Sequence, residues 1–532
     1  MTKPLAPSTG PGASGLDRRA LLARGVALGG ASALWGLPRE VLAQAAASGQ
    51  LTLAFPADVP TWDPNARSLA AVQSLYKAVF DQPLTQAPDL SLQPALVTEW
   101  RYRDASGLAL ELTLRDDVHF HEGTKLTAED LRYTFFERPR APVPEGGRRL
   151  DTAFLWRRLK DVEVVSPTRA VMHFSEPMPS AVAWLAFLCS FVVPKAHLER
   201  VGLDAFSRAP VGSGPYRVVE YSQGARIVLE AFDRYWGGKP QIERVTIDVV
   251  RDPTARVAAA ESRRAHASAE VPIREAVRLG SVPGLVGRID PTADILLLQI
   301  SRTGGFEKTE VRLAAHHAIN KEALNRAFFQ GRAKPISVPA ARGTPGSPDD
   351  FEFPFSEARA TELLRSVGHA PDRPVKIKFF TTNGAVPNDF DVARAIVAMW
   401  RKVGIDADLE VIELSTYQER LRAGTLPEAT LFQWGNAVGD PEMYGGYLLD
   451  PKSIFSAFKA PDLEAPVRAL LTETDEAKRF AGYKEFHRTA VERGYSIPLL
   501  QATKTLVHRA EVEVTKYDNG WVLPATWSFK RA

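Results

Sequence analysis

One segment of the chain constrains the fold more than any other, because it repeats a strand followed by a helix. Apolar and polar residues alternate at 375–379 and again at 407–411, as expected of strands whose side chains point to opposite faces in turn. Between them, 389–403 has the pattern of a helix that ends before Gly404. A third strand is expected at 429–434. This order predicts right-handed crossovers, a parallel sheet and an α/β fold.

The same order predicts where a ligand would bind. A capping box, Ser-Thr-Tyr-Gln at 415–418, is expected to open a second helix ahead of the third strand. In open parallel sheets, ligands bind beyond the carboxyl ends of the strands. The loop that follows the third strand is WGNAVGDPEMY, residues 434–444, and we expect it to form part of a ligand site.

Residues 94–137 give a second ordered succession. Alternate leucines from Leu108 to Leu114 share one face of a predicted strand, since side chains alternate with period two. Thr127 is predicted to cap a helix, and Asp130 approximates the second half of a capping box. A half-buried strand followed by a short capped helix is therefore expected here.

Residues 1–45 have the pattern of an export signal. Arg18 and Arg19 precede the weakly apolar run 25–37, and the Ala-Gln-Ala at 43–45 fits the small-x-small rule for cleavage. The paired arginines resemble a twin-arginine signal. The apolar run is too short to span a bilayer, so we expect a cleaved signal and a periplasmic mature protein.

Charge and cysteine content exclude some classes of function. The whole chain has 66 basic and 63 acidic residues, and removal of 1–45 would leave 61 of each. A formally neutral mature protein gives no argument for nucleic acid as a partner. The single cysteine, Cys189, cannot form an intramolecular disulfide, and its apolar neighbours predict a core position rather than a reactive thiol.

Several motifs occur in one order along the chain: PALVTEW at 94–100, LRDDVHFHEG at 114–123, LTAEDL at 126–131, PVGSGPY at 210–216, FDRYWGGKP at 232–240 and EVRLAAHHAINKEAL at 310–324. This succession resembles family 5 extracellular solute-binding proteins, the peptide-binding class that delivers ligands to ABC importers. Asn320 stands where the family has Asp, and either residue caps a helix. Arg263 and His266 stand where the family carries a Gly-x-x-Asp, and His266 is interpreted as a solvated histidine.

The resemblance implies an α/β fold, a two-lobed periplasmic binding protein (type II-like, cluster C) with an extra subdomain in the first lobe. After the signal peptide at 1–45, the implied boundaries are 46–82 for the first segment of lobe 1 subdomain a, 83–203 for subdomain b, 204–292 for the second segment of subdomain a, 293–498 for lobe 2, and 499–532 for the C-terminal segment of subdomain a.

The function implied is capture of a small solute, peptide or peptide-like, between the lobes by hinge closure, without covalent chemistry. The implied partners are the ABC permease subunits of the inner membrane, and the binding protein itself is expected to be a monomer with no cofactor. A secreted enzyme or a ligand-sensing protein on the same scaffold is the alternative.

Four residues of the loop after the third strand are candidate ligand contacts: Trp434, Asp440, Asn436 and Tyr444. Trp434 is the first choice, with a core tryptophan as the alternative, and Asp440 could hold a cationic group or cap a turn ahead of Pro441. In peptide-binding members, an acidic residue three places after the tryptophan grips the α-ammonium of the ligand. Ala437 occupies that place here, which argues against routine peptide binding unless Asp440 or Glu442 reaches the same spot.

No compact catalytic or metal motif is evident. The sequence lacks Gly-x-Ser-x-Gly, His-Glu-x-x-His and a Walker lysine loop, and no catalytic residue is assigned. His119 and His121 would project from one face of a strand as two metal ligands do, but a third ligand is missing, so a polar strand face is the preferred interpretation and no metal is expected.

Overall fold

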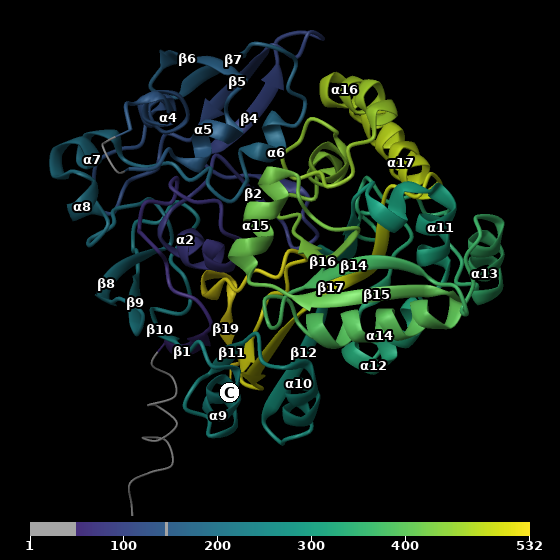
Figure 1. Cartoon of the computed structure of the whole chain (residues 1–532). Coiled ribbons are helices and arrows are strands. Elements are labelled where there is room, and N and C mark those ends of the chain that lie inside the picture. Colours follow the sequence, from purple (N-terminus) through teal and green to yellow (C-terminus); the bar gives the residue numbers. More distant parts are fainter. Residues whose placement is uncertain (1–48, 144–146, 532) are drawn as a thin grey trace, which may run out of the picture. The chain divides into compact units, whose positions relative to one another are not determined.

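The computed structural model describes residues 49–143 and 147–531, so the export signal predicted at 1–45 lies outside the described residues. One sheet of 11 strands runs in the order β15-β14-β16-β12-β17-β11-β1-β10-β9-β8, with β13 paired to β17 (Figure 1). Its strands are β1 (Gln50–Phe55), β8 (Tyr216–Ser222), β9 (Arg226–Ala231), β10 (Arg244–Val249), β11 (Ala267–Ala269), β12 (Leu285–Ile300), β13 (Lys334–Pro335), β14 (Val375–Thr381), β15 (Ile405–Val411), β16 (Ala429–Trp434) and β17 (Ile497–Arg509).

A second sheet has four antiparallel strands in the order β4-β5-β7-β6, formed by Val97–Tyr102, Ala109–Leu114, Arg169–Phe174 and Leu159–Ser166. Two small pairs, β2 (Leu84–Gln86) with β3 (Leu92–Pro94) and β18 (Val512–Glu513) with β19 (Ser528–Phe529), complete the strands of the described chain. The α-helices are α2 (Gln73–Val79), α3 (Ala128–Arg132), α4 (Arg138–Arg140), α5 (Asp151–Leu155), α6 (Ala181–Trp184), α7 (Lys195–Val201), α8 (Leu203–Phe206), α9 (Pro253–Glu261), α10 (Ile273–Gly280), α11 (Thr309–His317), α12 (Lys321–Phe329), α13 (Glu357–Ser366), α14 (Asp389–Val403), α15 (Leu414–Ala423), α16 (Glu464–Thr472) and α17 (Glu476–Glu492).

The strand-helix repeat at 375–434 has the predicted topology. Strand β14 pairs in parallel with both β15 and β16, and α14 ends at Gly404, whose φ of 105° suits glycine. The capping box predicted at 415–418 is wrong. Helix α15 begins at Leu414, because the N–H of Tyr417 already bonds to the carbonyl of Glu413, and no side chain caps it.

The short module at 94–137 is also close to prediction. Thr127 and Asp130 form the expected capping box at the start of α3. On β5, Leu110, Leu112 and Leu114 are buried, but Leu108, which lies just before the strand, is 39% exposed, so the prediction that it shares their face is wrong. Asn320 caps α12 as predicted, since its side chain accepts a hydrogen bond from the N–H of Ala323 at 2.9 Å.

Two long antiparallel strands, β12 and β17, join the two halves of the large sheet. They pair from Leu285 opposite Arg509 to Leu298 opposite Ile497, and Figure 1 shows β17 running between β16 and β11. Their register is interrupted between Pro291 and Ile295. Such irregularities bend a strand and redirect its side chains, and residues 292–294 have no register partner on β17.

The hydrophobic residues form separate cores. One contains residues from β1, β9, β10 and β11 together with Leu506 and Trp527, so the beginning and the end of the described chain share it. A second lies between the four-stranded sheet and the segment 181–192. A third surrounds α11, α12, α14 and the parallel strands. The domain boundaries given above stay a prediction, although this distribution of cores is compatible with them.

The PVGSGPY motif at 210–216 has a packing role. An added Cβ at Gly212 would lie 2.0 Å from the carbonyl oxygen of Val79, and one at Gly214 would lie 2.5 Å from its carbonyl carbon. Only glycine permits this close approach of two backbones. None of the helices in the described part of the chain is long and apolar enough to cross a bilayer.

Candidate functional site

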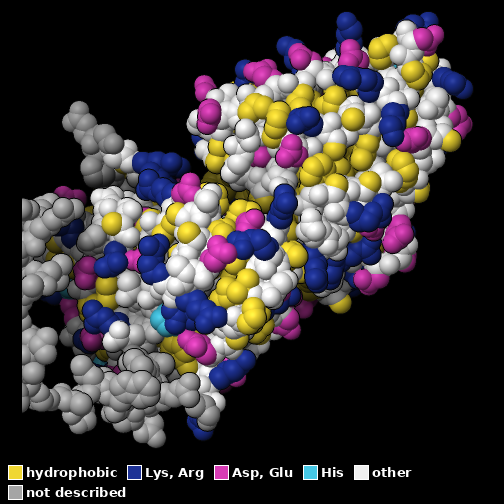
Figure 2. All heavy atoms as spheres, turned by 90° about the horizontal axis from the view of Figure 1, so that it is seen from below, with side chains coloured by type: hydrophobic (Ala, Val, Ile, Leu, Met, Phe, Trp, Pro, Cys, Tyr) yellow, Lys and Arg dark blue, Asp and Glu magenta, His cyan; other side chains and the backbone are white. Residues whose placement is uncertain are grey.

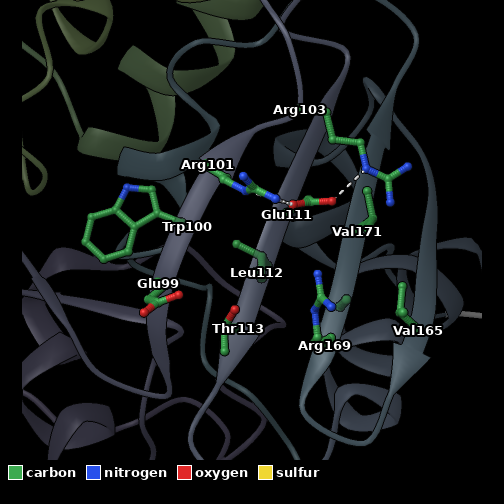
Figure 3. Close-up of a pocket in the computed structure, with 11 residues that line it drawn as sticks. Glu99, Trp100, Arg101, Arg103, Glu111, Leu112, Thr113, Val165, Arg169 and Val171 are labelled. Atoms are coloured by element: carbon green, nitrogen blue, oxygen red, sulfur yellow. Dashed lines mark hydrogen bonds and ion pairs between the residues drawn. The ribbon is translucent and has the colours of Figure 1, made fainter.

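Three of the hollows in the described structure have volumes of about 440 Å³ or more. One of about 440 Å³ lies on the surface between α13 and α14, and another of the same volume lies over the four-stranded sheet, where Arg101 and Arg103 both point toward Glu111 (Figure 3). Arg101 is 76% exposed, and both arginines already form ion pairs with Glu111 at 2.7 and 2.9 Å. This hollow is therefore part of an exposed sheet face on which Arg101 and Arg103 are already paired with Glu111. On the face in Figure 2, basic and acidic side chains are likewise interspersed rather than gathered by sign.

The larger cavity, of about 640 Å³, is lined by segments far apart in the sequence. They come from both halves of the large sheet and from the segment that carries the second core: 67–74, 148–155, 184–189, 269–270, 418–455 and 504–522, with Phe55 and Asp294. Ligand pockets typically have volumes of about 300–1,000 Å³ and apolar walls with a few polar groups. This cavity therefore has the size and the lining of a site for a small solute.

One wall of the cavity is aromatic. The rings contact one another in a continuous series, with centroids 5.6 Å apart for Trp434 and Phe455 and 5.7 Å apart for Tyr447 and Trp184. The series is Phe154, Trp184, Phe187, Trp434, Tyr447 and Phe455. Tilted and edge-on ring contacts of this kind hold the wall rigidly and present an apolar surface to a ligand.

The cavity also contains an ionic group formed by Glu270, Lys504 and Asp294. Lys504 Nζ lies 2.7 Å from Glu270 Oε1, and these side chains stay 34% and 40% exposed. Burial works against the charged forms, but the pKa of Lys504 is raised by the two carboxylates, and Lys504 lowers the pKa of Glu270. Both groups therefore remain charged in neutral solution.

Asp294 differs from Glu270 in its partners. It lies in the interrupted part of the β12–β17 ladder, and its carboxylate accepts long hydrogen bonds of 3.2 Å from the backbone N–H of Asn436 and from Gln433 Nε2. Burial raises the pKa of Asp294, although the charge of Lys504 opposes this. Within the described residues, no basic nitrogen lies within 4.0 Å of it.

The loop after β16, residues 434–444, contacts both the cavity and the second core. The indole N–H of Trp434 donates to the carbonyl of Met443 at 2.6 Å, and its ring lines the cavity. Ala437, Val438 and Met443 pack into the core beneath the four-stranded sheet. The loop is thus fixed on both sides.

A family model described as bacterial extracellular solute-binding proteins, family 5 Middle, matches residues 91–455. The chain belongs to family 5 of these proteins. The expected fold class, a two-lobed periplasmic binding protein, is confirmed by solved structures of the family. HbpA2 from Haemophilus parasuis superposes with a TM-score of 0.80 at 19% identity, over 91% of this chain and 100% of that one. NikA from Brucella suis in complex with Fe(III)-EDTA gives 0.78 at 22%, over 90% and 100%.

Relatives found by sequence differ in what their names say they bind. Di/tripeptide-binding protein 2 of Pseudomonas aeruginosa is 24% identical over 429 residues, which cover 76% of this chain and 80% of that protein. The glutathione-binding protein GsiB of Salmonella typhi is 23% identical over 520 residues, which cover 94% and 96%. The nickel-binding protein NikA of Staphylococcus aureus is 23% identical over 383 residues, which cover 72% and 71%. Family membership therefore establishes a solute-binding protein without naming its solute.

Of the four candidate contacts, Trp434 alone lines the cavity of this family 5 protein. The Asp440 carboxylate instead receives a hydrogen bond from Arg479 Nη1 at 2.8 Å, and both side chains are almost completely buried. It also accepts from the N–H of Glu442 at 2.9 Å and so caps the turn, which was the alternative interpretation. Glu442 adds a second carboxylate 3.6 Å from the Arg479 guanidinium. The expectation that Asp440 or Glu442 would reach the ligand position does not agree with this geometry.

Asn436 and Tyr444 are also used inside the loop. The Asn436 side chain donates to the carbonyl of Asp440 at 3.0 Å and accepts from the N–H of Gly439 at 2.9 Å. The Tyr444 hydroxyl donates to the carbonyl of Ala293, and its ring is fully buried. In this conformation neither side chain lines the cavity, because each holds the loop or β12 in place.

Sequence reasoning missed Glu270, Asp294 and Lys504. Glu270 has an unusual positive φ of 52° directly before the Val-Pro at 271–272. Asp294 interrupts an apolar strand, which could have been noticed as a charged residue in a buried pattern.

Three other sequence interpretations can be compared with the structure. Cys189 is buried as predicted, and burial raises the pKa of its thiol. His121 fixes the 212–214 turn by hydrogen bonds to Gly214 and Gly212, and the described residues contain no cluster suited to a metal ion. His266, interpreted as a solvated histidine, is half-buried and does not line the cavity. Its Nδ1 accepts from the N–H of Thr52 at 2.9 Å, and burial lowers its pKa to about 4.

Proposed function

We propose that the mature chain captures a small solute in the 640 Å³ cavity and delivers it to the permease subunits of an ABC importer in the inner membrane. The observation that carries this proposal is the composition of the cavity wall. Segments that belong to different cores contribute to one cavity, so a solute can contact all of them at once. Such contacts stabilise one relative arrangement of the lobes and shift the population toward it.

The strands β12 and β17 are the proposed hinge. They cross between the two halves of the large sheet, and their pairing is interrupted at 292–294 beside the cavity. Rotation about a few residues at such an interruption would open or close the cavity while the cores move as rigid bodies. The protein would then act without covalent chemistry, as a monomer, with ATP hydrolysis left to its partner subunits.

The proposed location is the periplasm, after export directed by a twin-arginine signal at 1–45. The family description as extracellular supports a position outside the cytoplasm. The solute is proposed to be a peptide or a peptide-like molecule, which is supported by relatives whose names record binding of di- and tripeptides and of glutathione.

Native mass spectrometry tests the proposal. Mature protein purified from its own periplasm should carry one small molecule, released and identified after denaturation and absent from protein that was unfolded and refolded. Refolded protein should recover the same molecule from a periplasmic extract. If the extracted protein is empty and periplasmic extract neither raises its melting temperature nor yields a bound molecule, the proposal is wrong.

A further inference from the structure

We propose that Asp294 binds a positively charged group of the solute, so that the cavity selects small molecules in which an ammonium-type cation is attached to an apolar body. This inference rests on the solute-binding function proposed above and adds the chemical class of the solute.

The first argument is the charge balance inside the cavity. Glu270 and Lys504 form an ion pair at 2.7 Å and compensate each other. Asp294 is left with two long neutral hydrogen bonds, and within the described part of the chain it has no ion-pair partner inside 4.0 Å. The charge of Lys504 also acts on Asp294, but Lys504 pairs directly with Glu270, so the Asp294 carboxylate is only partly compensated. Incomplete compensation of a half-buried carboxylate is unfavourable, because its lost hydration is not fully replaced. The three charges sum to one negative charge, which a singly charged cation would neutralise.

The second argument is position. The Asp294 carboxylate accepts from the backbone N–H of Asn436, the residue just before Ala437. Ala437 is the place at which the family resemblance expects an acidic residue for an ammonium group. In this chain a carboxylate reaches the same end of the loop from β12, through the interruption in the ladder. Asp440 is unavailable for this role, since Arg479 binds both of its oxygens.

The third argument concerns the rest of the ligand. Trp434 directly follows Gln433, the side-chain partner of Asp294, and its ring belongs to the aromatic wall. A ligand whose cation lies at Asp294 can therefore place its apolar part along Trp434, Tyr447 and Phe455. Aromatic faces also attract cations directly, which adds to the preference for a positive group.

Matched probes test the inference. Binding of phenylalanyl-leucine and of N-acetyl-phenylalanyl-leucine, and of phenethylamine and 2-phenylethanol, would be measured by calorimetry on the mature protein. In at least one pair, the probe with the ammonium group should bind at least about 10-fold more tightly than the probe without it, as expected for a charge-assisted hydrogen bond. Asp294→Asn should remove this preference, and Asp294→Ser should do the same if the asparagine variant folds poorly.

Asp248→Asn is the control, because Asp248 is a partly buried carboxylate of the large sheet that pairs with Arg226 at 3.0 Å and does not line the cavity. It should keep the parental preference. The inference is overturned if no probe with an ammonium group binds better than its partner without one, if the preference survives in Asp294→Asn, or if the solute retained by the native protein has no cationic group. A retained neutral solute would leave the proposed transport function standing, whereas an empty protein that binds neither extract nor probes would remove both.

Discussion

Replacing Asp440 with asparagine distinguishes an anchor of the loop from a ligand contact. The structure places the Asp440 carboxylate against the Arg479 guanidinium of α17, with exposed fractions of 10% and 3% for the two side chains. Asparagine has nearly the same shape, but it carries no charge and offers one acceptor oxygen instead of two. Of its acidic partners among the described residues, the guanidinium would keep only Glu442, at 3.6 Å.

The expected loss of unfolding free energy in Asp440→Asn follows from the burial of the ion pair. Removing one partner of a buried ion pair costs about 3–5 kcal/mol, and the remaining carboxylate of Glu442 places this case near the lower end, about 3 kcal/mol. The entropy of unfolding is about 2.1 cal/mol/K per residue, so a chain of this size has a total near 1 kcal/mol/K. The melting temperature of Asp440→Asn should therefore fall by about 3 °C.

The assay is differential scanning calorimetry of the parent, Asp440→Asn and the control Asp350→Asn. Asp350 makes the same type of ion pair with Arg488, also on α17, at 2.6 Å, but its side chain is 75% exposed. Exposed pairs contribute only about 0–1 kcal/mol, so the control should melt within about 1 °C of the parent. Equal melting temperatures for the two variants would refute the anchoring role, and unchanged stability with lost solute binding would make Asp440 a ligand contact.

Four further predictions concern other parts of the molecule. Because the Trp434 ring lines the cavity, Trp434→Ala should weaken solute binding at least about 10-fold in calorimetry, while the far-UV circular dichroism stays unchanged. Unchanged affinity in a folded variant would exclude Trp434 as a principal contact. Burial lowers the pKa of Lys321 from 10.5 to about 7, so between these pH values the unfolded chain binds more protons than the folded protein. The unfolding free energy should therefore rise with pH by about 1.4 kcal/mol per pH unit. In urea titrations between pH 7 and pH 9, Lys321→Met should lose this rise, and Lys308→Met, at an exposed lysine, should keep it. Gly212→Ala should reduce the yield of folded protein or lower the unfolding free energy by more than about 2 kcal/mol, because the added Cβ would lie 2.0 Å from a backbone oxygen. A variant as stable as the parent would contradict this packing. Cys189 should react with a thiol reagent only after denaturation, because its side chain is buried, and labelling of native protein at the same rate would show otherwise.

The sequence alone determined the elements that depend on near neighbours. The capping box of Thr127 and Asp130, the cap at Asn320 and the helix end at Gly404 each join backbone and side-chain groups only a few residues apart. Hydrophobic periodicity is equally local, and it predicted the parallel strands at 375–434 and the loop that follows them.

Only the tertiary structure decided which polar residues face the cavity. Asp440 could equally cap a turn, bind a buried arginine or hold a ligand, and the choice depended on Arg479, 39 residues farther along the chain. Glu270 and Lys504 are 234 residues apart and meet because β11 and β12 both pair with β17. Asp294 faces the cavity because the β12–β17 register breaks beside it. Such contacts depend on strand pairing over long sequence separations, which no local pattern of residues specifies.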